Sequence, residues 1–255
     1  MLGREATVSD MLGMPLPCPL KNPVRLSGGV AVFCDPCSYP KSLLRTVNMP
    51  GFTAAIGVHS RHVPGWSAAH KEAFKIFMRS PNTKALGEIG LDLTARGVKK
   101  QEETLQYLLR GFADPSRPVI LHLRRHRGKE DEIYFRGLKL VGPCLHREQP
   151  IQLHCFSGSA VAFAKWQKRF PDVYASFSGL VSSFEEHQKQ GLRAVPGDRL
   201  LLETDSPYLP AVGRGVGNTP HHVGDVAMLV SQVMQQPVLD VIELANANLK
   251  RLFRL

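Results

Sequence analysis

Short apolar runs recur along this chain and alternate with longer segments of mixed polarity. Seven of the runs have the length and the content of β-branched and aromatic residues that are typical of strands. They cover residues 30–34, 52–58, 84–92, 118–123, 150–155, 172–179 and 199–205. Several are apolar throughout, which indicates strands buried on both faces, as in parallel sheets. Within 84–92, Gly87 and Gly90 indicate a strand that turns sharply at its end.

The segments between these runs carry a helical pattern. We predict helices over residues 67–79, 99–113, 160–170, 183–194, 221–235 and 237–253. The clearest is 99–113, where one apolar stripe holds Leu105, Leu108, Leu109 and Phe112. Strands that alternate with helices over a chain of this length predict parallel strands joined by crossover helices. We therefore expect an α/β fold, a TIM-like (β/α)8 barrel.

An eight-stranded barrel requires one strand more than these seven, and only the segment before residue 30 has room for it. Residues 4–10 are the candidate, but their pattern is poor, and prolines dominate residues 13–23. We expect a degenerate first strand within an irregular N-terminal segment, residues 1–29. The sequence shows no internal repeat or linker, so we expect residues 1–255 to form a single domain.

The composition adds a preference for anionic partners. The chain has 255 residues, of which 43% are apolar, so it can bury a large core. Its formal net charge is +10, which favours nucleic acid, phosphorylated ligands or an anionic membrane surface. The alternative is an ordinary basic surface. The sequence lacks a run of about 18 apolar residues, so we expect no membrane span.

The cysteines indicate a reducing compartment. There are five, an odd number, and their spacing does not resemble a disulfide scaffold. Cys34 and Cys37 form one C-x-x-C, which without a second pair is either a redox pair or two ordinary thiols. We expect an intracellular protein, cytoplasmic or nuclear.

Four polar residues interrupt the apolar runs at or near their carboxyl ends, namely Glu88, His122, His154 and Asp205. In an α/β barrel these ends converge on one face, where active sites lie. Two imidazoles and two carboxylates there can bind a divalent metal, and zinc, manganese and magnesium are all chemically suitable. A metal also explains why carboxylates tolerate burial. Each residue alone could be structural, but four coincidences at equivalent positions favour a metal site.

The motifs around these residues resemble a known family. "ALGEIGLD", "PVILHLR", "IQLHCFSGS", "LLLETDSPYL", "GNTP" and "NANLKRLF" occur in that order between residues 30 and 255. Together they are similar to the TatD family of metal-dependent hydrolases and deoxyribonucleases. The resemblance implies cleavage of DNA phosphodiester bonds, often from the 3′ end, with single-stranded DNA or a 3′ end of DNA as the partner. It also implies that Glu88 bridges two metals and that His122 and His154 complete one metal shell. Asp205 would bind the other metal and orient or deprotonate the attacking water, so Glu88 and Asp205 are the candidate catalytic residues.

The sequence departs from this family at its start. Family members open with a His-x-His pair on the first strand, whereas no histidine precedes His59 in this chain. Alignment of Ser9 and Asp10 with the residues after the pair places Ala6 and Val8 at the histidine positions. One metal would then keep only Glu88 and Asp205 from the protein. We therefore expect a weakened metal site that holds one or two ions.

Basic residues beside the proposed site suggest a phosphate ligand. Arg124 follows His122 by two residues and begins the stretch "RRHRGK", which is either a phosphate clamp or a solvated turn. His59, in "IGVHSRH", resembles a family histidine near the substrate, although a structural role is the alternative. Trp66 and Tyr208 could stack on bases or simply pack.

Three functions remain open from the sequence. The first is a metal-dependent nuclease with a weakened metal site. The second is a catalytically inactive relative that binds DNA or RNA, and the third is a small-molecule hydrolase of the wider amidohydrolase kind. The barrel architecture alone cannot choose among them, because one fold supports many chemistries. The positive charge favours nucleic acid over small neutral substrates.

Overall fold

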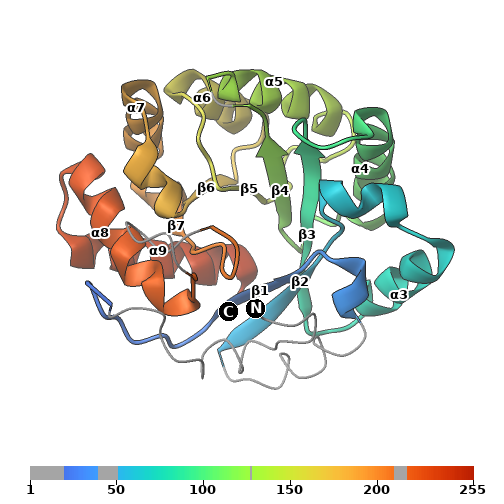
Figure 1. The fold of residues 1–255 in the computed structure, drawn as a ribbon, viewed down its shortest axis with the longest axis horizontal. Coiled ribbons are helices and arrows are strands. Elements are labelled where there is room, and N and C mark those ends of the chain that lie inside the picture. Colours follow the sequence, from blue (N-terminus) through green and yellow to red (C-terminus); the bar gives the residue numbers. More distant parts are fainter. Residues whose placement is uncertain (1–19, 40–50, 127, 210–216) are drawn as a thin grey trace.

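A computed structural model describes residues 20–39, 51–126, 128–209 and 217–255. Seven strands form one sheet in chain order, and every neighbouring pair is parallel. The strands are β1 (Gly29–Phe33), β2 (Phe52–Ile56), β3 (Thr83–Asp92), β4 (Val119–Arg124), β5 (Ile151–His154), β6 (Val173–Phe177) and β7 (Leu200–Leu202). The sheet curls around a central space and the helices lie outside it (Figure 1). The expected TIM-like α/β barrel is confirmed.

The helices that cover the sheet are α3 (Ala68–Met78), α4 (Val98–Phe112), α5 (Glu130–Val141), α6 (Ala160–Arg169), α7 (Glu186–Ala194), α8 (Val223–Met234) and α9 (Val238–Phe253). Six of them match the predicted helices to within a few residues. No helix was predicted from the sequence at α5. That omission was wrong: α5 buries Ile133, Tyr134 and Val141 on one face. Gly137 interrupts its apolar pattern because a Cβ there would come within 2.9 Å of Leu123.

The N-terminal predictions are tested only in part. Residues 20–28 contain neither helix nor strand, as expected. The candidate strand 4–10 lies outside the described residues. Among the strands that are described, β1 pairs with β2 and β7 pairs with β6, and no pairing joins β1 to β7. The assignment of residues 1–255 to a single domain stays a prediction.

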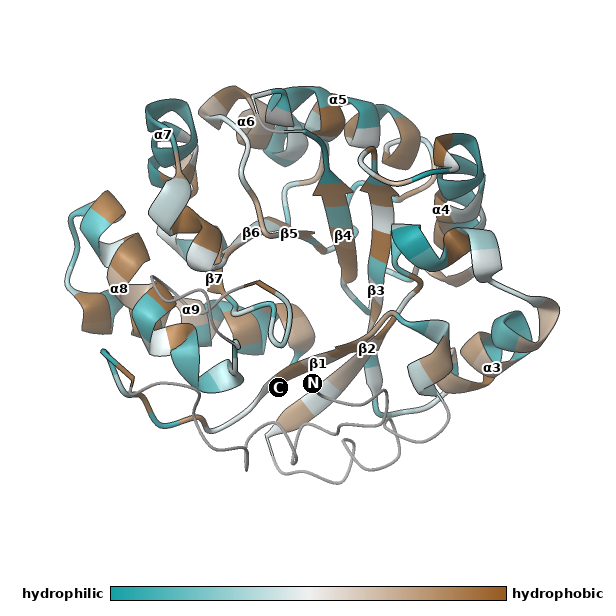
Figure 2. Ribbon diagram, viewed as in Figure 1, coloured by the Kyte–Doolittle hydropathy of each residue, from teal (hydrophilic) through white to brown (hydrophobic). Residues whose placement is uncertain are grey.

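Alternation of side chains along the strands divides the core into two clusters. The larger cluster fills the space between the sheet and the helices, and in Figure 2 hydrophobic and hydrophilic positions alternate along these helices. The smaller cluster faces the interior of the barrel and includes Ala55, Ala85 and Ile120. Leu252 and Phe253, at the end of α9, join this interior cluster. The C-terminal helix therefore packs against the floor of the barrel, below the strand ends.

Strand β3 contains a bulge that determines where Glu88 points. Leu86 pairs with Val119 and Ile89 with Leu121, so β3 has one residue more than β4 over this interval. A bulge re-aims a side chain; here it allows Ala85 and Glu88, three residues apart, to face the same interior. Gly87 and Gly90 flank Glu88 within the strand rather than marking its end, so the predicted sharp turn was wrong.

Within the described part of the chain, no helix is both long enough and apolar enough to cross a membrane.

Candidate metal centre

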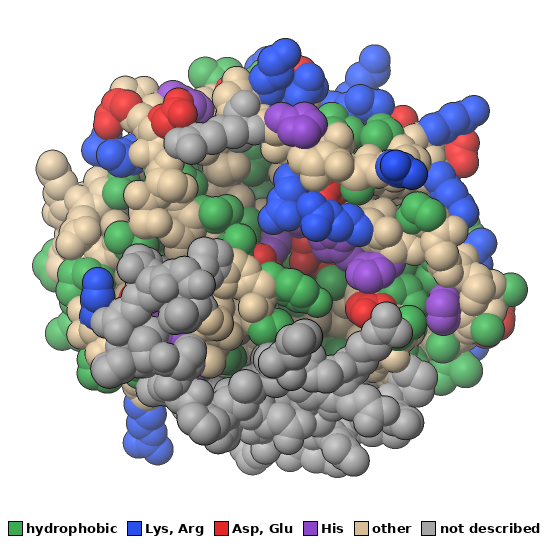
Figure 3. Space-filling model, in the orientation of Figure 1, with side chains coloured by type: hydrophobic (Ala, Val, Ile, Leu, Met, Phe, Trp, Pro, Cys, Tyr) green, Lys and Arg blue, Asp and Glu red, His purple; other side chains and the backbone are tan. Residues whose placement is uncertain are grey.

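The residues that interrupt the apolar runs converge at one mouth of the barrel. Figure 3 shows histidine and acidic side chains gathered at the centre of this face, with Lys and Arg side chains beside them. Glu88 Oε1 contacts His122 Nδ1, and Glu88 Oε2 lies 3.7 Å from His154 Nε2. The same His154 nitrogen lies 3.4 Å from Asp205 Oδ1. The predicted clustering of these four side chains is observed, although Glu88 belongs to the body of β3 and not to its end.

Unusual backbone conformations place two residues of the centre. Cys155 follows β5 and Asp205 follows β7, and both have positive φ, 47° and 55°. L-residues other than glycine seldom adopt this left-handed region, and such residues concentrate at functional sites. The ligand atoms of Cys155, Asp205 and His154 all lie within 4.8 Å of one another.

Glu203 orients His154, and the sequence analysis did not identify it. Glu203 Oε2 accepts a hydrogen bond from His154 Nδ1 at 2.8 Å, and Oε1 accepts one from the Cys155 backbone N–H at 2.7 Å. Because Glu203 holds Nδ1, Nε2 is the His154 nitrogen that faces Glu88 and Asp205 and that a metal could bind. A carboxylate behind a histidine is the usual support of a metal ligand. The signal was present in "LLLETD", where two acids flank one threonine.

The ring nitrogens of His59 have the opposite roles to those of His154. It follows β2 as the N-cap of a short 3-10 helix, Ser60–Gly65, and its Nδ1 accepts a hydrogen bond from the Arg61 backbone N–H at 3.1 Å. The neutral ring therefore carries its proton on Nε2, which lies 3.9 Å from Glu88 Oε1. His59, Glu88 and His122 are close enough to share a metal. However, an N–H at Nε2 makes His59 a hydrogen-bond donor and not a ligand.

The charges at the centre shift the pKa values in opposite directions. Burial lowers the pKa of His59 to about 4, and His122 adds to this effect. Burial also lowers the pKa of His154, but Cys155, Glu203 and Glu88 outweigh it, so the net pKa is well above the usual value. Burial raises the pKa of Glu88, yet His154 and His122 hold the net pKa far below its ordinary range. Glu88 is therefore an anion surrounded by imidazoles.

Basic side chains lie at the rim of this mouth. Arg124 ends β4, and because alternate strand residues share a face, its side chain lies on the side that carries His122. It is half-buried. Arg61 is also at the rim, where its Nε donates to the buried carboxylate of Asp92 at 2.9 Å. Burial raises the pKa of Asp92, but hydrogen bonds from Thr94 and Arg61 lower it by more. The net pKa is below the usual value, so the carboxylate stays ionised.

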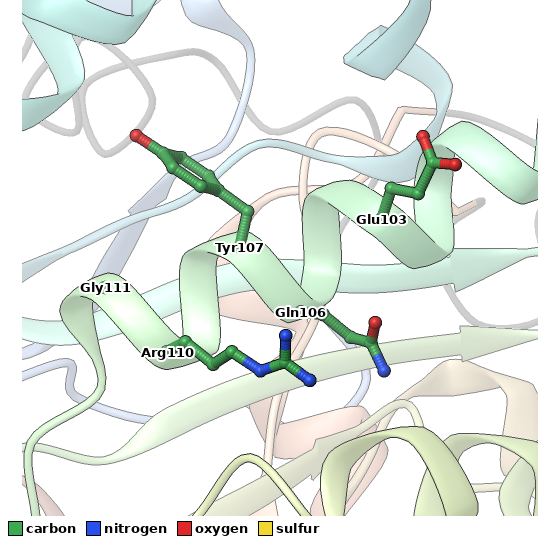
Figure 4. Close-up of a pocket in the computed structure, with 5 residues that line it drawn as sticks. All are labelled: Glu103, Gln106, Tyr107, Arg110 and Gly111. Carbon is green, nitrogen blue, oxygen red and sulfur yellow. The ribbon is translucent and has the colours of Figure 1, made fainter.

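A separate pocket lies away from this centre. It is a shallow depression of about 450 Å³ on the outer face of α4, lined by Glu103, Gln106, Tyr107, Arg110 and Gly111. Figure 4 shows these side chains projecting from one exposed helix. None of the acids and histidines of the centre reaches it, so it is not the site of the chemistry.

The donor set of the centre fits a divalent metal. His122 Nε2 is buried and has no hydrogen-bond partner within the described residues. An orphaned buried nitrogen is costly unless something binds it. His154 Nε2 lies near the carboxylates of Glu88 and Asp205, and imidazole with carboxylate suits zinc, manganese or iron-like ions. The residues that could hold such an ion are Glu88, His122, His154 and Asp205.

Comparison with known proteins agrees with these motifs. The model of the TatD related DNase family matches residues 25–254. The chain belongs to this family. Its relatives include a protein named 3′-5′ ssDNA/RNA exonuclease TatD from Citrobacter koseri, 29% identical over 77% of this chain and 76% of the relative. The metal-dependent hydrolase YabD from Bacillus subtilis is 29% identical over 79% of this chain and 77% of the relative.

A third relative is much longer than this chain. The 3′-5′ RNA nuclease TATDN2 from Homo sapiens is 25% identical over 91% of this chain but only 31% of its own length. Solved structures share the fold. The TatD homologue YJJV from Escherichia coli has a TM-score of 0.72 and 22% identity, with 90% of this chain and 87% of that chain covered. A TatD family hydrolase from Entamoeba histolytica has a TM-score of 0.71 and is 16% identical in sequence. The match covers 89% of this chain and 84% of that chain.

Proposed function

We propose that this protein is a metal-dependent nuclease that hydrolyses phosphodiester bonds in single-stranded nucleic acid. The observation that carries the proposal is the convergence of Glu88, His122, His154 and Asp205, with an orphaned His122 nitrogen, at a mouth bordered by arginines. A bound divalent ion would polarise the phosphate and lower the pKa of water.

The side chains divide the work of such a reaction. Glu88, His122 and His154 would hold the ion, and Asp205 would take the proton of the attacking water. His59 donates from Nε2 to a non-bridging phosphate oxygen, since its Nδ1 is already occupied by the Arg61 N–H. Arg124 contacts a phosphate at the rim and positions the strand without reading its sequence.

The substrate class is inferred from charge and from the relatives. The net charge of +10 favours a polyanion. Tyr208, three residues after Asp205, is 68% exposed and offers a ring on which an unpaired base can stack. Relatives named 3′-5′ exonucleases of single-stranded DNA or RNA support a 3′ end as the preferred substrate. We place this activity in the cytoplasm or nucleus, because the described cysteines are free, as in a reducing compartment.

The test is cleavage of single-stranded DNA and RNA labelled at either end, with magnesium, manganese or zinc, and with EDTA. We expect slow, metal-dependent loss of nucleotides from the 3′ end. Glu88→Gln removes the central carboxylate and should abolish the activity, whereas Glu243→Gln on the exposed face of α9 should not. Cleavage that survives both EDTA and the Glu88→Gln substitution would contradict the proposal of a metal-dependent nuclease.

An inactive nucleic-acid-binding relative is the second candidate, because the alignment expected from the sequence places Ala6 and Val8 where the family has its His-x-His pair. Both positions lie outside the described residues. The variant Ala6→His with Val8→His should raise metal occupancy and rate together if the site is weakened. Tight binding of single strands with no cleavage, in the wild type and in this variant, would favour the binding protein.

A further inference from the structure

Arg61 lies at the rim of the barrel mouth, and the proposed function gives its side chain no task. It follows His59 by two residues, within the short 3-10 helix Ser60–Gly65. Its backbone N–H donates to His59 Nδ1 at 3.1 Å, and the centroid of the His59 ring lies 4.4 Å from that of the His122 ring. The backbone of Arg61 is therefore bound to a ring that itself packs against the candidate ligand His122.

The side chain of Arg61 is held along one edge of its guanidinium. Nε donates to Asp92 Oδ2 at 2.9 Å, and Nη2 donates to Thr94 Oγ1 at 3.4 Å. These two N–H groups are parallel and form one edge of the planar fork. A guanidinium has five N–H donors, so in the described contacts three remain, on Nη1 and on the outer edge of Nη2. The side chain is 54% exposed, so a ligand from solvent can reach this second edge.

The anchor of Arg61 is buried and fixed at several points. Asp92 is the last residue of β3, and its side chain is 0% exposed. Its Oδ1 accepts a hydrogen bond from the Thr94 backbone N–H at 2.9 Å, and its own backbone N–H donates to Gln101 Oε1 at 2.9 Å. Gln101 belongs to α4 and is also buried. An arginine on such an anchor is preorganised, so it loses little freedom when it binds a ligand.

The register of the sheet places this anchor beside Arg124. Asp92 on β3 pairs with Arg124 on β4, and two residues earlier Gly90 pairs with His122. Strand residues rise about 3.3 Å each, so Asp92 lies roughly 7 Å farther along the strands than His122 does. Residues two apart on a strand share a face, so Asp92 is on the face that carries His122. Arg61 and Arg124 therefore bring positive charge to neighbouring strand ends, beyond the level of the candidate metal ligands.

We propose that Arg61 binds a second phosphate of the nucleic-acid strand, adjacent to the phosphodiester at the metal centre, and that Asp92 positions Arg61 for this contact. The proposal rests on the proposed function, because it assumes that a single strand lies in this mouth. Two parallel N–H groups at the second edge of the guanidinium donate to two oxygens of the phosphate. Asp92 holds the opposite edge and touches no substrate. The contact favours strands over compounds with one phosphodiester, and it reads no base.

The test neutralises the phosphates of the ligand one at a time. Thymidine octanucleotides labelled at the 5′ end carry an uncharged methylphosphonate at one position each, and their binding to the full-length protein is measured by fluorescence anisotropy in EDTA. We expect one position, adjacent to the 3′-terminal phosphodiester, at which the substitution weakens wild-type binding about 10-fold, the lower end for a hydrogen bond to a charged group. At that position Arg61→Gln should bind both ligands equally, because the two changes remove the same contact.

Asp92→Asn distinguishes a positioning role from a purely structural one. The amide keeps the shape of the side chain and the bond from the Thr94 N–H, but it removes the charge that holds Nε of Arg61. Asp92→Asn should therefore lose the discrimination at the same position of the ligand. In cleavage of the unmodified octanucleotide with manganese, its KM should rise while kcat stays unchanged, as for loss of a contact made equally in the ground and transition states.

The matched control is Arg110→Gln on the outer face of α4, which removes the same charge away from the mouth and should retain the wild-type discrimination. Circular dichroism verifies that each variant is folded. Equal losses in the wild type and in Arg61→Gln at every methylphosphonate position would overturn the phosphate contact. Metal-dependent cleavage would in that case still support the nuclease. Discrimination through Arg61 without any cleavage would keep the phosphate site and overturn the nuclease.

Discussion

The two sides of the metal centre present their ligands in different ways. On one side, Glu88 and His122 belong to the ten-residue strand β3 and the six-residue strand β4, and both strands continue beyond these residues. On the other side, His154 ends the four-residue strand β5, and Asp205 follows the three-residue strand β7. The second side therefore depends on individual contacts, of which Glu203 makes several. We infer that a side built this way can change its ligands without rebuilding the sheet.

The same contrast is visible in two histidines. His59 and His154 lie on opposite sides of Glu88, yet burial and His122 lower the pKa of the first while acidic neighbours raise that of the second. Their hydrogen bonds agree with this difference, because a backbone N–H occupies Nδ1 of His59, whereas Nδ1 of His154 donates to Glu203. One side chain type is thus a neutral donor on one side and, in the proposed function, a metal ligand on the other.

Removal of Glu88 should have the largest effect, because Glu88 touches both sides. Glu88→Gln keeps the shape but replaces the anion that meets His122 and His154. We expect the rate of cleavage of single-stranded DNA to fall by at least about 10²- to 10³-fold, the range for loss of one preorganised electrostatic group. Metal content and rate are measured together. Glu102→Gln, which removes the partner of Arg136 at the surface, is the control.

His59 provides a pH test of the first side. Its pKa of about 4 in the folded protein lies below the unfolded value of about 6.5, so the unfolded chain binds more protons between them. The contribution of a neutral His59 to the free energy of unfolding is therefore fully present above pH 6.5. It is lost as the pH falls toward 4. A shift of this size corresponds to about 3 kcal/mol. Urea unfolding of the EDTA-treated protein at a series of pH values should show the free energy of unfolding rising with pH over this range.

The comparison that isolates His59 is with His59→Gln, because glutamine does not titrate. The free energy of unfolding of the wild type, minus that of the variant, should rise between about pH 4 and 6.5. His62→Gln, at an exposed neighbour, is the matched control and should retain the wild-type slope. If His59→Gln gives the same slope as the wild type, His59 is not the buried neutral histidine described above.

The first side is also the one that the sequence predicted better. Continuous apolar runs identified all seven strands, and Glu88 and His122 stand out inside them. Glu203 was missed because an acid at a strand end is ordinary, and its partner His154 lies 49 residues away along the chain. The bulge at Glu88 was missed for a related reason. Its glycines are visible in the sequence, but the register that makes them necessary depends on β4.

Glu203 should matter more for metal binding than for folding. Glu203→Gln keeps the volume but removes the charge that holds the proton of His154 on Nδ1. Loss of such a support costs about 10- to 100-fold in metal affinity. Competition titration with Zn²⁺ measures this change, and Glu186→Gln at an exposed ion pair of α7 is the control. Unchanged affinity would mean that the second side is as rigid as the first.

Arg124 should have the smallest effect, since its proposed role is one substrate contact at the rim and it supports no other residue of the centre in the described contacts. Arg124→Ala removes one charge from the side that carries His122, so binding of single-stranded DNA should weaken at every sequence alike. The log–log dependence of affinity on salt should become shallower by about 0.7, the value for one phosphate contact on a single strand. Arg110→Ala, on the outer face of α4, removes the same charge far from the mouth and should leave the slope unchanged. Equal slopes for both variants would mean that overall charge, and not the arginine beside His122, attracts the nucleic acid.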